Sequence, residues 1–315
     1  MAVGIIEAKN FPPEAQKLLR SLGPLVFAGT DYWEAETIEG LFCRIGIYLD
    51  KDYLDEFESL KWIASPTTSL SHMDMGYLQE RGISIYSLRN LKAEALQKLT
   101  STAELTVFLT LAIARNYINL VNSPGSISGW DRYAYPSDQL ASKTIGIVGL
   151  GRIGSRVYTT LSALGVNVVG FDIRPVSTRN FVPVILSSIT TLLEKSDIVI
   201  LCASYDPKQP PILSREVLRT GKLGFKLVNT SRGELVDESA IAELMRSGHM
   251  TGYATDVIAG EPHNKFWTSP ILSLLKEGFN VIHTPHIGGA GSDSLRLSEN
   301  MLAEYVVEKL SEAEK

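Results

Sequence analysis

The chain has 315 residues, a length that accommodates two domains of ordinary size. Apolar residues make up 44% of it and charged residues 21%, as in globular proteins that fold in water, and the net charge of −5 gives no general attraction to nucleic acid. The longest strongly apolar stretch, 105–114, is too short to span a bilayer, and the first residues do not resemble a secretory signal. We therefore expect a cytoplasmic protein that binds neither membranes nor nucleic acid.

The first hundred residues alternate between helix and strand patterns. Strands separated by helices imply parallel pairing with right-handed crossovers, so this part is expected to form an α/β unit. The patterns predict helices at 13–22, 53–60 and 75–81, and strands at 24–28, 42–48, 61–64 and 83–87. Cys43, in one of these apolar runs, and Cys202 further on are expected to be free thiols.

A polar loop, 65–72, follows the strand that ends at Ala64. Ligands in open α/β sheets bind beyond the carboxyl ends of the strands, so this loop is placed to contact one. From the residues alone, a polar connector that caps the next helix explains the loop equally well. For His72 the pattern favours a surface histidine over a catalytic one.

A long helix is expected at 99–116, with an apolar stripe that includes Leu105, Leu109 and Ile113 facing the core. It lies between the first α/β unit and the next one and is expected to link two domains. The stretch 122–130, rich in turn-forming residues, indicates an exposed excursion.

A G-x-G-x-x-G motif lies between the apolar strand 144–148 and a helix expected at 155–164. Glycine at Gly149 permits a tight turn, at Gly151 lets a pyrophosphate approach the backbone, and at Gly154 lets helix and strand pack closely. The amides and the positive end of the helix dipole then face the phosphates. Taken alone, the motif is weak evidence.

A second strand, 166–171, makes the interpretation specific, because it leads directly to Asp172. A carboxylate at that place accepts hydrogen bonds from the ribose hydroxyls of NAD and repels the 2′-phosphate of NADP. A glycine-rich turn in an ordinary α/β protein is the alternative. The combination favours an NAD site.

Three charged side chains follow further strand ends. Strands are expected at 197–203, 226–229, 252–257 and 281–283, and Arg232, Glu261 and His286 each lie shortly after one of the last three. An arginine can hold a carboxylate with two parallel hydrogen bonds, a histidine can supply a proton, and a glutamate can orient and charge that histidine. Singly, each has an ordinary structural explanation; their joint placement favours hydride transfer to a 2-oxo acid.

These features resemble the D-isomer-specific 2-hydroxyacid dehydrogenase family, which includes phosphoglycerate dehydrogenases, hydroxypyruvate and glyoxylate reductases and D-lactate dehydrogenases. Besides the glycine motif with Asp172, the matching stretches are 229–237, 256–262 and 284–289. Weaker matches at 102–104 and 129–130 extend the resemblance over nearly the whole chain.

The resemblance implies a doubly wound parallel-sheet (Rossmann) dinucleotide-binding domain at 99–287. It also implies a smaller flavodoxin-like α/β substrate domain formed by 1–98 and 288–315. It implies an NAD-dependent oxidoreductase that moves a hydride between nicotinamide and C2 of a small 2-oxo or 2-hydroxy acid, usually as a homodimer. The expected catalytic residues are Arg232 as substrate anchor, His286 as general acid/base and Glu261 as its partner. The expected cofactor-binding residues are Gly149, Gly151, Arg152, Ile153, Gly154, Asp172, Cys202, Thr230 and Asp256, the last at the nicotinamide carboxamide.

Two stretches depart from the family pattern. Where the family commonly has a glycine-bearing loop that binds the substrate carboxylate, this chain has Thr67, Thr68, Ser69 and Leu70. Ser69 and Leu70 are expected to bind substrate with Arg232, but the identity of the acid cannot be carried over. The stretch 204–207 replaces a loop that usually begins with proline. No metal site is expected.

Two other functions remain open at this point. The family also includes corepressors in which NADH binding controls assembly, and a scaffold of that kind with little turnover would retain the glycine motif. Members that oxidise formate have glutamine in place of the glutamate, so Glu261 weighs against that reaction.

Overall fold

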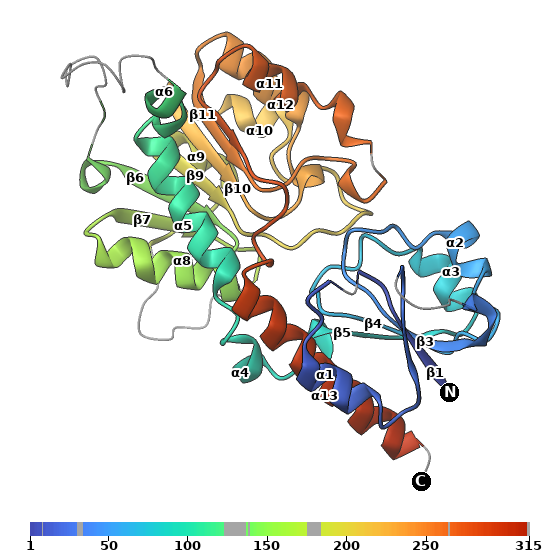
Figure 1. Ribbon diagram of the computed structural model, residues 1–315. Coiled ribbons are helices and arrows are strands. Elements are labelled where there is room, and N and C mark those ends of the chain that lie inside the picture. The colour runs from blue at the N-terminus through green and yellow to red at the C-terminus, as the bar shows by residue number, and fades with distance from the viewer. Residues whose placement is uncertain are drawn as a thin grey trace. The chain divides into compact units, whose positions relative to one another are not determined.

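The computed structural model describes residues 1–7, 9–29, 34–122, 137, 139–174, 184–263 and 265–313. The chain forms two compact units, one made of 1–99 with 290–315 and the other of 100–289 (Figure 1). Each has its own parallel sheet with helices on both faces, as the alternation of helix and strand patterns predicts. Within the described residues, no helix is both long enough and apolar enough to cross a membrane.

The unit formed by both ends of the chain has a five-stranded sheet in the order β2-β1-β3-β4-β5. All neighbouring strands are parallel. The strands are β1 (Ala2–Ile5), β2 (Leu25–Phe27), β3 (Ile38–Phe42), β4 (Trp62–Ser65) and β5 (Ser84–Ser87). The helices are α1 (Pro13–Leu19), α2 (Lys51–Asp55), α3 (Met75–Glu80), α4 (Ala93–Leu96) and α13 (Ser292–Ala313).

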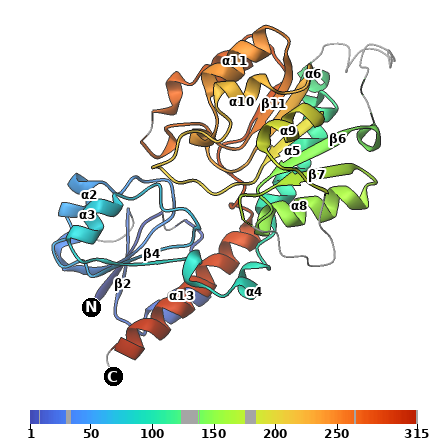
Figure 2. The same ribbon diagram turned by 180° about the vertical axis from the view of Figure 1, so that it is seen from behind.

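Helices cover both faces of this sheet (Figures 1 and 2). A separate apolar cluster lies on each face. On one face, Leu19 of α1 and Leu302 of α13 pack with Ile5 of β1. On the other, Leu54 of α2 and Leu78 of α3 pack with residues of β3 and β4. The last helix of the chain is therefore part of the core built by the first hundred residues.

The unit 100–289 has a seven-stranded parallel sheet in the order β12-β11-β10-β9-β6-β7-β8. Its strands are β6 (Thr144–Val148), β7 (Asn167–Phe171), β8 (Val184–Ile185), β9 (Ile198–Leu201), β10 (Phe225–Asn229), β11 (Met250–Thr255) and β12 (Val281–His283). Its helices are α5 (Ser101–Ala114), α6 (Tyr117–Asn122), α8 (Arg152–Ala163), α9 (Ile189–Lys195), α10 (Arg215–Arg219), α11 (Glu238–Arg246) and α12 (Pro270–Lys276).

Helices α5 and α8 cover one face of the seven-stranded sheet, and α9 to α12 cover the other (Figures 1 and 2). The strand order reverses between β6 and β9, so the loops that follow these two strands flank the switch point where doubly wound sheets bind ligands. This is the Rossmann-type arrangement that the glycine motif predicts.

Several sequence expectations need correction. The strand expected at 42–48 is wrong, because β3 ends at Phe42, and β1 was not predicted. The helix expected at 53–60 is α2, which begins earlier because the Asp50 side chain accepts a hydrogen bond from the amide of Tyr53 (2.9 Å). The excursion expected at 122–130 lies almost entirely outside the described residues.

Candidate active site

The glycine loop closes tightly at the switch point of the seven-stranded sheet. Gly149 follows β6 with a φ of 91°, and a Cβ there would lie 2.7 Å from the carbonyl oxygen of Cys202, which follows β9. A Cβ on Gly154 would lie 2.0 Å from the Gly149 carbonyl oxygen. Both positions therefore need glycine, because helix α8 packs directly against the two strand ends.

Gly151 differs from the other two glycines, since a Cβ built there meets nothing within 4 Å. It is the N-cap of α8 and provides no side-chain cap, so the helix begins with the backbone amides of Arg152 and Ile153 and the positive end of its dipole. Open space over a helix N-terminus fits a pyrophosphate. The glycine loop is thus compatible with NAD.

Three further expected cofactor residues lie at the same sheet edge. The carboxylate of Asp172 accepts hydrogen bonds from the amides of Leu150 (2.8 Å) and Arg174 (2.9 Å), which holds it beside the glycine loop. The hydroxyl of Thr230, after β10, lies 2.7 Å from that of Thr106 on α5. Burial raises the pKa of Cys202 to about 12, so its side chain is a neutral thiol, and both cysteines are free as expected.

A buried asparagine shapes the turn that carries Arg232. The Asn229 side chain donates to the Arg232 carbonyl oxygen (2.9 Å) and accepts from the Ser231 amide (3.0 Å). Next in the chain, a Cβ on Gly233 would lie 2.0 Å from the backbone nitrogen of Ala259. Glycine at this position therefore lets the arginine turn pack against the turn that leads to Glu261.

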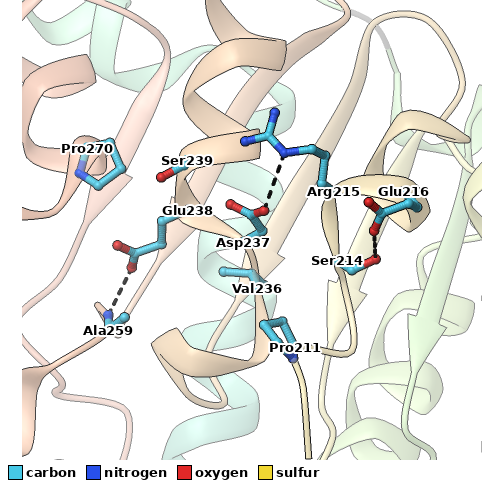
Figure 3. Close-up of a pocket in the computed structure, with 10 residues that line it drawn as sticks. All are labelled: Pro211, Ser214, Arg215, Glu216, Val236, Asp237, Glu238, Ser239, Ala259 and Pro270. Atoms are coloured by element: carbon cyan, nitrogen blue, oxygen red, sulfur yellow. Dashed lines mark hydrogen bonds and ion pairs between the residues drawn. The ribbon is translucent and has the colours of Figure 1, made fainter.

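Three carboxylates hold that second turn by its backbone amides. Glu261 accepts from Ile258 (2.8 Å), Glu238 from Ala259 (2.9 Å) and Glu234 from Gly260 (3.0 Å). Glu238 reaches Ala259 from the first turn of α11 (Figure 3). Asn229, Glu234 and Glu238 were not predicted as site residues, although Asn229 and Glu234 lie in the matching stretch 229–237 and Glu238 directly follows it.

A shallow pocket of about 470 Å³ lies beside Glu238. Arg215, which lines it, pairs with Asp237 (3.7 Å; Figure 3). It also pairs with Glu243. Because these carboxylates already compensate the guanidinium charge, we assign no substrate to this pocket.

His286 and Glu261 form a direct pair. The histidine Nδ1 lies 2.7 Å from the glutamate Oε2, and both side chains are only partly exposed, at 26% and 20%. Asp256, directly after β11, is buried and accepts hydrogen bonds from the 284–288 loop that carries His286. Arg232, Glu261 and His286 thus belong to one compact unit and follow strands β10, β11 and β12, which are neighbours in its sheet.

The expected substrate loop belongs to the other compact unit. The hydroxyl of Thr67 donates to the carbonyl oxygen of Ser69 (2.7 Å), and the carbonyl of Leu70 accepts from the amide of Met73 (3.1 Å). His72 is only 2% exposed, and its Nε2 lies 3.1 Å from Ser65 Oγ, so the expectation of a surface histidine is wrong. No group of three or more potential metal ligands occurs among the residues that the structure describes.

A doubly wound sheet with an open glycine loop and an acidic residue after the second strand defines a dinucleotide-binding oxidoreductase fold. Residues 107–288 match the family model described as D-isomer specific 2-hydroxyacid dehydrogenase, NAD binding domain. The chain belongs to this family, and NAD-dependent hydride transfer is the chemistry of the family.

Similar proteins span several activities within the family. The chain is 30% identical over 312 residues to D-3-phosphoglycerate dehydrogenase of Methanocaldococcus jannaschii, covering 96% of this chain but only 57% of that protein. It is 28% identical over 310 residues to glyoxylate reductase of Thermofilum pendens, covering 97% of this chain and 84% of the relative. The crystal structure of D-lactate dehydrogenase from Aquifex aeolicus, complexed with NAD and lactic acid, superposes with a TM-score of 0.81. The superposition covers 99% of this chain and 96% of the D-lactate dehydrogenase chain. Because the two sequences are only 22% identical, this match supports the fold alone.

Proposed function

We propose that the protein reduces a small 2-oxo acid to the 2-hydroxy acid with NADH, and catalyses the reverse reaction with NAD. The observation that carries this proposal is the 2.7 Å contact between His286 Nδ1 and Glu261 Oε2. The pair lies in the same compact unit as the glycine loop and Arg232. Such a set is needed when a carbonyl oxygen must be protonated next to an anchored carboxylate.

Each residue of the site has a separate role in the proposed reduction. Bound NADH supplies the hydride to the carbonyl carbon. The planar guanidinium of Arg232 holds the substrate carboxylate. His286 donates the proton to the carbonyl oxygen through Nε2, because Nδ1 faces Glu261, whose negative charge stabilises the imidazolium. Ser69 and Leu70 are proposed to contact the substrate.

The cofactor assignments follow the same proposal. Gly149, Gly151, Gly154 and the first amides of α8, at Arg152 and Ile153, would hold the pyrophosphate. Asp172 would hold the ribose, and Cys202, Thr230 and Asp256 would line the remainder of the site.

The test is a panel of 2-oxo acids with NADH, followed by the loss of NADH absorbance, on the unmodified protein and on Arg232→Ala. We expect the substitution to lower kcat/KM about a hundredfold or more with nearly unchanged NADH affinity, and lysine to restore only part of it. Arg215→Ala is the matched control, since its guanidinium pairs with Glu243 and Asp237 in the same unit. NADH binding without turnover of any oxo acid would instead support an NADH-sensing scaffold.

We further propose that the protein is a homodimer through the unit 100–289. Four large apolar side chains of α5 and α6 are exposed there: Phe108 at 53%, Leu111 at 37%, Tyr117 at 46% and Val121 at 44%. Apolar residues on all sides of a surface helix indicate that a partner covers it. Light scattering should show a dimer for the unmodified protein and a monomer for Phe108→Asp. Leu164→Asp, at an exposed apolar position directly after α8, should leave the dimer intact. A monomeric unmodified protein would contradict the proposal.

A cytoplasmic location remains a prediction, which fractionation of the source cells would test.

A further inference from the structure

The side chain of Asp256 is directed at the loop that carries His286. It is 1% exposed, and its Oδ1 accepts hydrogen bonds from Thr284 Oγ1 (2.5 Å) and the Ile287 amide (2.9 Å). Its Oδ2 accepts from the Gly288 amide (2.7 Å). The backbone carbonyl of Asp256 accepts a further hydrogen bond from the amide of His286 (2.9 Å). One residue thus binds four of the five residues from 284 to 288.

The loop needs such support because its backbone is unusual at His286. That residue has a φ of 54°, in the left-handed region that residues other than glycine rarely adopt. Two residues after His286, a Cβ on Gly288 would lie 2.8 Å from Asp256 Oδ2. The glycine therefore lets the loop backbone come close enough to donate to the carboxylate, and the carboxylate compensates a strained conformation next to it.

We infer that Asp256 is the positioning residue of the proton donor: its carboxylate fixes the 284–288 backbone so that His286 meets Glu261. This inference rests on the proposed function of His286. It differs from the contact with the nicotinamide carboxamide expected for Asp256, because it assigns the carboxylate an effect on the histidine that does not depend on the cofactor.

The ionised form of Asp256 is the one that suits this role. Burial raises the pKa of the Asp256 carboxyl, while the Thr284 hydroxyl and the amides of Ile287 and Gly288 oppose that rise because they donate to the carboxylate. All three loop groups are donors, so an asparagine would turn its NH2 group toward at least one of them. Asp256→Asn should therefore keep the volume of the side chain and yet disturb the loop.

A pair of variants at Thr284 tests the inference without touching Asp256. Thr284→Val removes the hydroxyl that donates to Oδ1, whereas Thr284→Ser keeps it. We expect valine to lower kcat about tenfold with NADH affinity, measured by its fluorescence, unchanged within about twofold, and serine to remain close to the unmodified protein. Thr268→Val is the control, since that exposed hydroxyl only donates to the Lys265 carbonyl oxygen.

Proton NMR gives a readout that does not require turnover. The proton between His286 Nδ1 and Glu261 should give a low-field resonance, assigned by its loss in Glu261→Gln. We expect this resonance to persist in Thr284→Ser and to weaken or shift in Thr284→Val and Asp256→Asn. If the resonance responds but no 2-oxo acid is reduced even by the unmodified protein, the proposed function fails and the positioning of His286 stands.

Two results would overturn the inference. One is an unchanged resonance and unchanged kcat in Thr284→Val. The other is a loss of NADH affinity in Asp256→Asn that accounts for its whole loss of activity, because the carboxylate would then act on the cofactor.

Discussion

Asp172 is the residue that predicts a preference for NAD over NADP. Its carboxylate is held by the amides of Leu150 and Arg174, and its side chain is 12% exposed. A negative charge fixed there should repel a 2′-phosphate. We expect Asp172→Ser to narrow the preference for NAD over NADP at least about tenfold, or about 1.4 kcal/mol, measured as the ratio of kcat/KM values. Equal use of both cofactors by the unmodified protein would contradict this reading of the strand end.

The pair of His286 and Glu261 gives a pH-dependent prediction. In reduction His286 must enter protonated, so kcat/KM should be flat at low pH and fall as rising pH removes that proton. Oxidation should show the opposite slope, because the neutral imidazole then accepts a proton. Glu261→Gln removes the carboxylate that lies 2.7 Å from His286 Nδ1, so kcat for reduction should fall while NADH affinity stays nearly unchanged. An unchanged kcat in Glu261→Gln would show that Glu261 is not the partner of His286.

The residues of the site differ in how far the sequence could predict them. Arg232, Glu261 and His286 were selected because they follow strand ends, and parallel strands bring their carboxyl ends to one edge. The contact between Asp256 and the 284–288 loop depends on a positive φ at His286, which no local pattern indicates. His72 was misjudged because its partner, Ser65, lies at the buried end of β4, seven residues away in the sequence.

At the scale of single elements, the first turn of α11 carries a buried carboxyl. Glu238 is 8% exposed and accepts hydrogen bonds from the Ala259 amide (2.9 Å) and the Ser269 hydroxyl (2.6 Å). Burial raises its pKa, more than these two hydrogen bonds lower it. Its folded-state pKa therefore lies above the unfolded value, so its contribution to stability is complete below the unfolded pKa and is lost as pH rises through the folded one.

Glu238→Gln should therefore become more favourable relative to the unmodified protein as pH rises, because glutamine does not ionise. Thermal unfolding at a series of pH values from about 4 to 8 measures this as the Tm of the variant minus that of the unmodified protein. The difference should increase with pH. Glu194→Gln, at an exposed position on α9, is the control, and a Tm difference that falls with pH would contradict the prediction.

The placement of individual elements was predicted less well than their order. The strand expected at 42–48 lies instead at β3, which contains Gly40, and glycine is usually unfavourable in strands. Here a Cβ on Gly40 would lie 2.1 Å from the buried ring of Trp62 on β4, so the neighbouring strand requires it. Helix α5 likewise ends at Ala114 rather than at 116, and Asn116 has a φ of 53°. Tertiary contacts and single backbone angles decided both boundaries.

At the scale of the whole molecule, the alternation of helices and strands was sufficient to predict two parallel α/β sheets. The glycine motif identified which of them binds the dinucleotide. The alternation does not predict the strand order, because each crossover connection can lead to a new strand on either side of the preceding one.

One compact unit is a single continuous segment of the chain and the other is formed from both ends of it. This difference predicts which fragments of the protein fold on their own. The unit 100–289 is one continuous segment that contains its complete seven-stranded sheet and helices on both faces. The other unit needs α13, whose Leu302, Ala303 and Val306 are fully buried in a cluster with Val3 and Ile5. Residues 1–99 alone would therefore expose one face of their sheet.

We accordingly expect a fragment of residues 100–289 to unfold cooperatively and to bind NADH, and a fragment of residues 1–99 to remain largely unfolded. Joining 1–99 to 290–315 through a flexible linker should restore folding, because it returns the apolar residues of α13 to the cluster. Leu302→Ala in that joined protein should cost about 2–5 kcal/mol, measured by urea unfolding. Cooperative folding of 1–99 alone would show that α13 is dispensable for this core.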